Sequence, residues 1–61
     1  MTREEAISAM RSGYKVTHEY FTPEEYLHMQ DGIVKCEQDC YYGIATMYGN
    51  DFMATGWSIR E

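Results

Sequence analysis

Two histidines and two cysteines are the side chains of this sequence best suited to metal chemistry. His18, His28, Cys36 and Cys40 together would make a complete ligand set for zinc. The spacing argues against a site, because three residues separate the cysteines and a predicted hairpin sends Cys36 and His28 to opposite faces. We therefore expect no metal, with Cys36 as a small core residue, Cys40 in a loop and both histidines on the surface of strands.

Either cysteine could pair with a histidine in nucleophilic catalysis, but nothing else in the sequence supports an enzyme. The sequence contains no nucleophile elbow, no candidate oxyanion loop and no glycine-rich phosphate loop. Glu4, Glu5, Glu24 and Glu25 are better explained as residues at the starts of helices. We expect a protein without catalytic residues and without a cofactor.

The aromatic residues are the most informative feature. Six tyrosines, with Phe21, Phe52 and Trp57, exceed what one small core encloses, so some should be partly exposed. The alternative is that they fill a core poor in leucine. Exposed tyrosines suit an interface between chains, or a stacking wall for a nucleobase. The predicted interface residues are Tyr26, Tyr41, Tyr42, Tyr48, Glu37 and Asp39.

Charge and hydropathy narrow the class of partner. Ten acidic and five basic side chains give a net charge of −5, which disfavours direct binding of nucleic-acid duplexes. No stretch approaches the roughly 18 consecutive apolar residues of a membrane span. The sequence runs from Met1 into an amphipathic pattern without a basic and apolar leader, so we expect a cytoplasmic protein.

A chain of 61 residues forms one domain, over residues 1–61, of marginal stability. Natural chains of this length usually gain stability from disulfides, a metal or a partner subunit. Two cysteines in a protein without a leader argue against a disulfide framework. We therefore expect a homo-oligomer.

The first predicted element is a helix over residues 3–12. Thr2 and Glu5 form a capping box, and Gly13 can adopt the left-handed conformation that ends a helix. An apolar stripe runs along the helix at the required spacing. It consists of Ala6, Ile7, Ala9 and Met10.

The next elements are a strand, a turn and a hairpin. Alternation over residues 14–20 predicts the strand, and Thr22-Pro23-Glu24-Glu25 predicts a single helical turn. Asp31-Gly32 favours a two-residue type I′ hairpin, which sets the register of the flanking strands. That register puts Leu27, Met29, Val34 and Cys36 on one face, and Tyr26, His28, Gln30, Lys35 and Glu37 on the other.

The second half of the sequence is read as further strands. Cys40–Tyr48 is predicted as a third strand, followed by a turn at residues 49–51 and a strand at Phe52–Ala54. Trp57–Arg60 is predicted as the last strand. The fold class is therefore α+β, with a short N-terminal helix packed on a small twisted antiparallel sheet of four to five strands.

Four segments resemble small proteins of bacteriophages and prophages. They are Thr2-Arg3-Glu4-Glu5-Ala6-Ile7, Gly13-Tyr14-Lys15-Val16-Thr17-His18, Asp31-Gly32 and Gly56-Trp57-Ser58-Ile59. The layout is also similar, more distantly, to the Thoeris anti-defence sponge proteins, which open with a short helix and a Gly-x-x-Val strand and close with a tryptophan strand. That resemblance implies a β-rich oligomer that sequesters cyclic nucleotide signals between subunits, and a counter-defence role in the host cytoplasm.

The sequence thus favours a phage-type accessory protein that acts by binding, with two main mechanisms. In the preferred mechanism, an acidic, tyrosine-rich surface docks on a basic patch of a host defence protein and inhibits it. In the alternative, aromatic side chains of two subunits sandwich a nucleotide messenger. Its phosphates would need Arg3, Arg11, Lys15, Lys35 or Arg60. A small structural virion protein is a third alternative.

Overall fold

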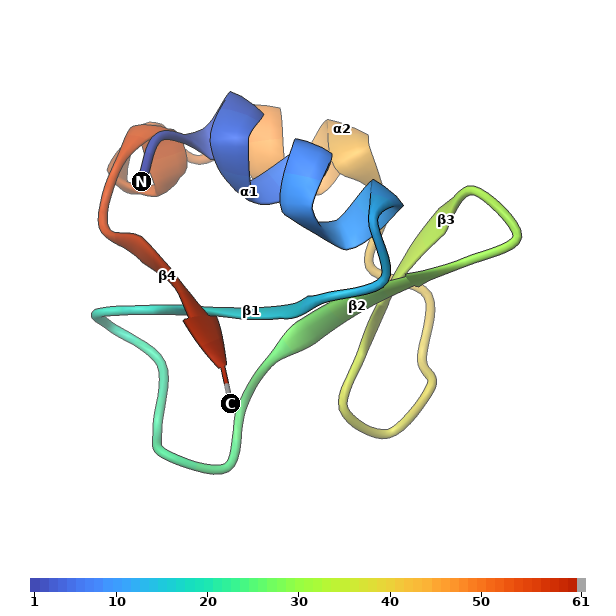
Figure 1. Cartoon of the computed structure of the whole chain (residues 1–61). Helices are drawn as coiled ribbons and strands as arrows, with labels where there is room; N and C mark the ends of the chain where they lie inside the picture. The colour runs from blue at the N-terminus through green and yellow to red at the C-terminus, as the bar shows by residue number, and fades with distance from the viewer. Residues whose placement is uncertain (61) are drawn as a thin grey trace.

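The computed structural model describes residues 1–60 and consists of a four-stranded antiparallel sheet with helices on one face (Figure 1). In chain order the elements are α1 (Arg3–Arg11), β1 (Lys15–His18), β2 (Leu27–Gln30), β3 (Ile33–Cys36), α2 (Ile44–Tyr48), the 3-10 helix η1 (Asp51–Ala54) and β4 (Trp57–Arg60). The strand order is β3-β2-β1-β4, so the last strand, β4, pairs with the first strand, β1. The predicted α+β class is confirmed, with four strands.

Helix α1 begins at the predicted capping box. The backbone N–H of Glu5 donates to Thr2 Oγ1 at 3.2 Å, and the N–H of Thr2 donates to Glu5 Oε1 at 2.8 Å. These two bonds satisfy donors that a helix start otherwise leaves unpaired. The buried side of α1 carries Ala6, Ile7 and Met10, which pack on the sheet.

The β2–β3 hairpin has the predicted turn and register. Asp31 and Gly32 both have positive φ, at 54° and 78°, as a type I′ turn requires. Leu27 pairs with Cys36, and Met29 pairs with Val34. Leu27 and Val34 are buried, so the hydrophobic face of the hairpin points into the core.

Strand β1 is shorter than predicted, at Lys15–His18, and Tyr14 and Tyr20 at either end are exposed. The predicted turn after it is closed by two hydrogen bonds. The N–H of Glu25 donates to Thr22 O at 3.0 Å, and the N–H of Thr22 donates to Glu25 Oε1 at 2.8 Å. This turn returns the chain to β2.

The strands predicted at Cys40–Tyr48 and Phe52–Ala54 are wrong, because the chain forms α2 and η1 there. Tyr41 forms an isolated bridge to Lys35, and the N–H groups of Tyr42 and Gly43 donate to Val34 O. The chain then turns up over the sheet with Gly43 at φ 86°. Met47 of α2 and Met53 of η1 are buried, so these helices extend the layer that α1 begins (Figure 1). Packing of this layer overrides the strand propensity of the aromatic residues.

The core lies between the helices and the sheet. It consists of Ala6, Ile7, Met10, Val16, Leu27, Val34, Met47, Met53 and Trp57. The indole N–H of Trp57 donates to Met53 O at 2.6 Å, which joins β4 to η1. Within residues 1–60, no helix is long and apolar enough to cross a membrane.

Candidate functional site

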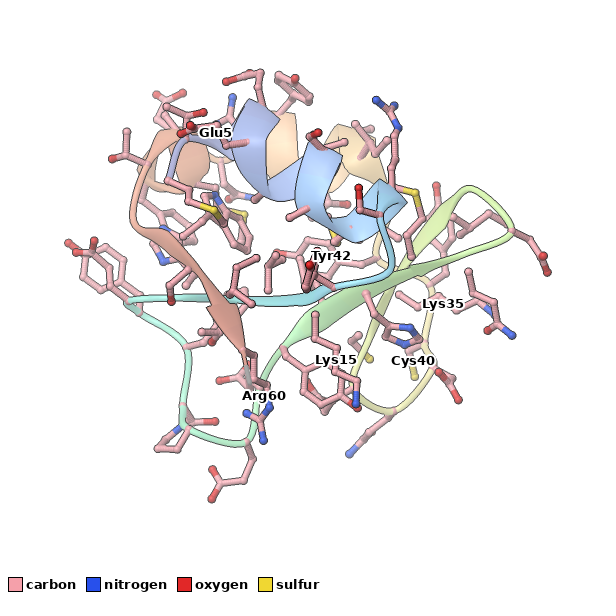
Figure 2. All side chains as sticks on the ribbon, viewed as in Figure 1. Glu5, Lys15, Lys35, Cys40, Tyr42 and Arg60 are labelled. Carbon is pink, nitrogen blue, oxygen red and sulfur yellow. The ribbon has the colours of Figure 1, made fainter. Side chains whose placement is uncertain are left out.

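The face of the sheet that points away from α1, here called the outer face, carries most of the candidate chemistry. Figure 2 shows Lys15 and Arg60 on this side of the ribbon, with Glu5 of α1 on the opposite side. Residues on this face occupy the strand positions that alternate with the buried ones. They are Lys15, Thr17, His28, Gln30, Ile33, Lys35, Ser58 and Arg60.

Four nitrogen-bearing side chains lie in one row across the four strands. Arg60 is opposite Lys15, and His28 is opposite Lys35. The pairing of Val16 with Leu27 puts Lys15 beside His28, which completes the row. We call Arg60, Lys15, His28 and Lys35 the cationic row. Three gaps between neighbouring strands make it about 14 Å long.

Tyr26 sits between the first two cations of the row. Lys15 Nζ and the Arg60 guanidinium each lie 4.9 Å from the centre of its ring. Like charges on directly opposite strand residues repel, and the ring offsets part of that repulsion through cation–π attraction. Arg60 is fixed further by a hydrogen bond from Nη1 to Pro23 O. Two cations are thereby held side by side on the outer face.

The lysines and the arginine of the row have no carboxylate partner within residues 1–60. The one contact between a basic side chain and a carboxylate found there joins His28 Nε2 to Asp39 Oδ1 at 3.0 Å. Lys35 Nζ donates to the neutral side chain of Gln30 at 3.2 Å. Three of the five lysines and arginines of an acidic protein thus share one face, where an anion would relieve their repulsion.

Four of the predicted interface residues lie beside this row. The N–H of Tyr26 donates to Glu37 Oε1 at 3.4 Å, and Asp39 pairs with His28. Tyr41 pairs with Lys35 at the edge of the sheet, and 76% of its surface is exposed. The two acids gather near the β3 end of the row, whereas Lys15 and Arg60 lie near the other end.

Tyr42 and Tyr48 lie elsewhere. The Tyr42 hydroxyl donates to the sulfur of Met53 at 3.4 Å, and burial, followed by the charge of Glu25, raises the pKa of Tyr42. Tyr48 donates to Glu4 Oε2 at 3.0 Å on the helical side of the molecule. That hydrogen bond is the main reason why the pKa of Tyr48 is raised. The six predicted residues therefore do not form one continuous surface.

The expectation that some aromatic residues are exposed is confirmed. Large parts of five rings are accessible to solvent: Tyr14, Tyr20, Tyr41, Tyr48 and Phe52. Tyr20 and Phe52 pack together, with ring centres 5.8 Å apart, whereas Tyr41 lies at the sheet edge and Tyr48 lies against α1. Exposure alone therefore selects no single patch.

His18 was expected on the strand surface, and this is wrong, because only 3% of it is exposed. Its Nε2 lies 2.7 Å from Thr55 O and 3.0 Å from Phe52 O, and its Nδ1 accepts from the N–H of Tyr20 at 3.1 Å. Both ring nitrogens are committed, and the partners of Nε2 are carbonyls, so the proton lies on Nε2. The ring is packed among aromatic side chains: Tyr20, Phe21, Phe52 and Trp57. His18 is a structural residue.

The two cysteines lie opposite each other, but the four residues considered as candidate metal ligands do not come together. The N–H of Cys36 donates to Cys40 O at 2.9 Å, which holds the two cysteines opposite each other. The neighbouring Cys36 thiol is the largest cause of the raised pKa of Cys40, ahead of the charges of Glu37 and Asp39. Within residues 1–60, no three metal-ligating side chains gather at one point.

Two open depressions lie outside the cationic row. One, of about 500 Å³, lies between the end of α1 and the β2–β3 turn and is lined by Met10, Arg11, Gly13, Met29, Asp31 and Gly32. The other, of about 250 Å³, is lined by Gly32, Ile33, Val34, Tyr41, Gly43, Ile44 and Ala45. Neither depression brings an acid–base pair or a nucleophile together with a histidine.

The cationic row was missed by sequence reasoning. The hairpin register correctly put His28 and Lys35 on one face, but the pairing of Lys15 with Arg60 joins residues from the two ends of the chain. The available signal was that Lys15 and Arg60 both occupy polar positions of alternating segments. No local pattern says which segments become neighbours.

Comparison with known proteins found no matching family model, no similar curated protein and no similar solved structure. The resemblance to phage proteins therefore stays a prediction.

Proposed function

We propose that this chain is a phage-type accessory protein that acts by binding, without turnover, and that it holds a phosphate-bearing nucleotide signal on its outer face. The observation that supports this proposal is the cationic row, in which Lys15, Lys35 and Arg60 have no carboxylate partner within residues 1–60. This arrangement supplies the local positive charge that a net charge of −5 would otherwise deny an anionic ligand.

The two ends of the row bind different parts of the nucleotide. Lys15 and Arg60 give a pair of cations for one phosphate, and the Tyr26 ring fixes their spacing. Because cations already cover Tyr26, it orients them and does not stack a base. The exposed Tyr41 ring beside Lys35 is free to stack a base.

The length of the row favours more than one phosphate. A span of about 14 Å across four strands exceeds the reach of a single phosphate. A cyclic or linear dinucleotide brings two phosphates and two bases to the row, whereas a mononucleotide uses only one end. In the proposed oligomer, a second copy would cover the other side of the ligand.

Calorimetric titration with cyclic and linear dinucleotides tests this function. We expect binding that raises the melting temperature by mass action and weakens as salt rises. Lys15→Gln should weaken binding at least tenfold. The matched control is Arg11→Gln, which removes the same charge from an exposed position on α1 and should leave affinity within twofold.

Two results would contradict the proposal. Equal losses in Lys15→Gln and Arg11→Gln would mean that only net charge matters. No heat and no thermal shift with any nucleotide would remove the nucleotide function altogether.

A host defence protein with a basic surface is the second candidate partner. It is favoured by the exposed Tyr48, whose hydroxyl donates to Glu4, and by Glu5, which follows Glu4 in the first turn of α1. The test is co-purification of the chain with host proteins. The Lys15→Gln variant should still capture the partner, whereas the Glu4→Gln variant should not. Capture by Glu4→Gln and loss of capture by Lys15→Gln would exclude the surface around Tyr48 and Glu4.

A further inference from the structure

A three-residue loop after β3 brings Cys36 and Cys40 face to face. The N–H of Cys36 donates to Cys40 O, and the N–H of Asp39 donates to Cys36 O, both at 2.9 Å. Asp39 has φ 61°, which is the left-handed residue that completes this class of hairpin loop. The two cysteines are therefore the closing pair of the loop.

The geometry of such a pair suits a covalent bond. Residues opposite each other across an antiparallel hairpin have Cα atoms about 5.5 Å apart, which lies inside the range found for disulfides. The neighbouring bridge between Lys35 and Tyr41 keeps the two strands of this loop in antiparallel register, so Cys36 and Cys40 share one face. Cys40 is exposed and Cys36 is half-buried, so an external reagent meets Cys40 first.

We propose that Cys36 and Cys40 form a reversible disulfide with a small-molecule disulfide, such as oxidised glutathione, as the oxidant. The Cys40 thiolate attacks one sulfur of the reagent and releases one glutathione thiolate. The Cys36 thiolate then attacks the Cys40 sulfur of the mixed disulfide and releases the second. The protein thiols lose two protons and two electrons, and the reagent gains both electrons and two protons as it becomes two thiols.

The surroundings of Cys40 set the speed of this reaction. The neighbouring Cys36 thiol and the charges of Glu37 and Asp39 raise the pKa of Cys40 and so disfavour the thiolate, which is the attacking form. We expect slow oxidation at neutral pH and faster oxidation as the pH rises. Asp39→Asn should also speed the reaction, because it removes a neighbouring negative charge.

The disulfide would act on one end of the outer face. The loop that it closes carries Asp39, which pairs with His28, and leads directly to Tyr41 beside Lys35. Oxidation would fix this loop without touching Lys15 or Arg60. The proposal stands on the cysteine pair and is independent of what the outer face binds.

The test is exposure of the whole chain to a glutathione redox buffer at pH 7.5 and pH 9, followed by alkylation and intact-mass measurement. We expect a monomer that is lighter by two hydrogen atoms, resists alkylation and returns to the starting mass with a reducing agent. Cys36→Ser should instead accumulate a glutathione adduct on Cys40, because the resolving thiol is absent.

Either of two results would overturn the proposal. One is a wild-type chain that keeps the glutathione adduct as Cys36→Ser does. The other is a disulfide-linked dimer in place of the oxidised monomer. Thermal melts of Cys36→Ser and Cys40→Ser confirm that the serine variants are folded, and Cys40→Ser should react more slowly than the wild type because its remaining thiol is half-buried.

Discussion

The two faces of the sheet use the same kinds of side chain for opposite purposes. On the inner face, His18 is buried among aromatic rings with both nitrogens bonded to the backbone. On the outer face, His28 lies in the cationic row and pairs with an exposed carboxylate. The residue type is identical. The two histidines differ because successive residues of a strand point to opposite faces of the sheet. Which face a residue occupies therefore decides whether it supports the fold or stays available to a ligand.

Among the substitutions that test the difference between the two faces, replacement of His18 should reduce stability most. His18→Ala should lower the free energy of unfolding by roughly 3 to 5 kcal/mol, because it leaves a cavity and removes partners from the Tyr20 N–H and the Thr55 carbonyl. A domain of this size has little more stability than that. Urea unfolding followed by tryptophan fluorescence measures it, since Trp57 packs on the ring.

The matched substitution on the outer face is His28→Ala. It should cost less, about 1 kcal/mol, because His28 is only half-buried and its contact with the exposed carboxylate of Asp39 contributes little. Similar losses for the two histidines would mean that the faces do not differ as described.

The second prediction contrasts two aliphatic residues of the same hairpin. Leu27→Ala should destabilise the protein by about 2 to 4 kcal/mol, because Leu27 is only 2% exposed. Ile33→Ala, on the outer face beside the turn, should cost less than 1 kcal/mol because Ile33 is 43% exposed. The two midpoints of urea unfolding give the comparison directly. A larger loss for Ile33→Ala would show that something covers the outer face in solution.

The hairpin and the segment after it differ in how well the sequence predicts them. Asp31-Gly32 and the alternating residues around it specify a turn and a register locally, and the structure has both. Residues 40–54 contain small and aromatic residues that suit a strand or a short helix. Their structure is decided by contacts with distant parts, such as Met47 in the core and Tyr48 against Glu4.

The sequence predicts only the part of the candidate site that lies within one hairpin. The sequence correctly separated Leu27 from His28 by face, because both belong to one hairpin. It could not place Arg60 beside Lys15, since they belong to the first and last strands and no local pattern shows that these strands pair. It also missed the burial of His18, because its partners Phe52 and Thr55 lie in and directly after the segment predicted as the strand Phe52–Ala54.

The third prediction separates two neighbouring tyrosines of that segment. Tyr42→Ser should cost about 2 kcal/mol, because its ring packs on the core and its hydroxyl reaches Met53. Tyr41→Ser should leave stability almost unchanged and instead weaken assembly, since its ring is exposed. Thermal melts and mass determination by light scattering distinguish the two. An unchanged oligomer in Tyr41→Ser, or a wild-type monomer, would count against Tyr41 as an interface residue.

The smallest effect concerns the helix that covers the inner face. Hydrogen bonds from the backbone and hydroxyl of Thr2 lower the pKa of Glu5 below its ordinary value of 4.5. The folded state therefore holds this proton less tightly than the unfolded state, so the carboxylate stabilises the fold above pH 4.5 and the benefit is lost as the pH falls through the lowered value. Glu5→Gln keeps the capping geometry and removes the titration. Melts at pH 7 and pH 3 should show a smaller acid-induced drop in Tm for Glu5→Gln than for the wild type. Equal drops would mean that the capping box loosens in solution and that α1 is held on the sheet by its apolar side alone.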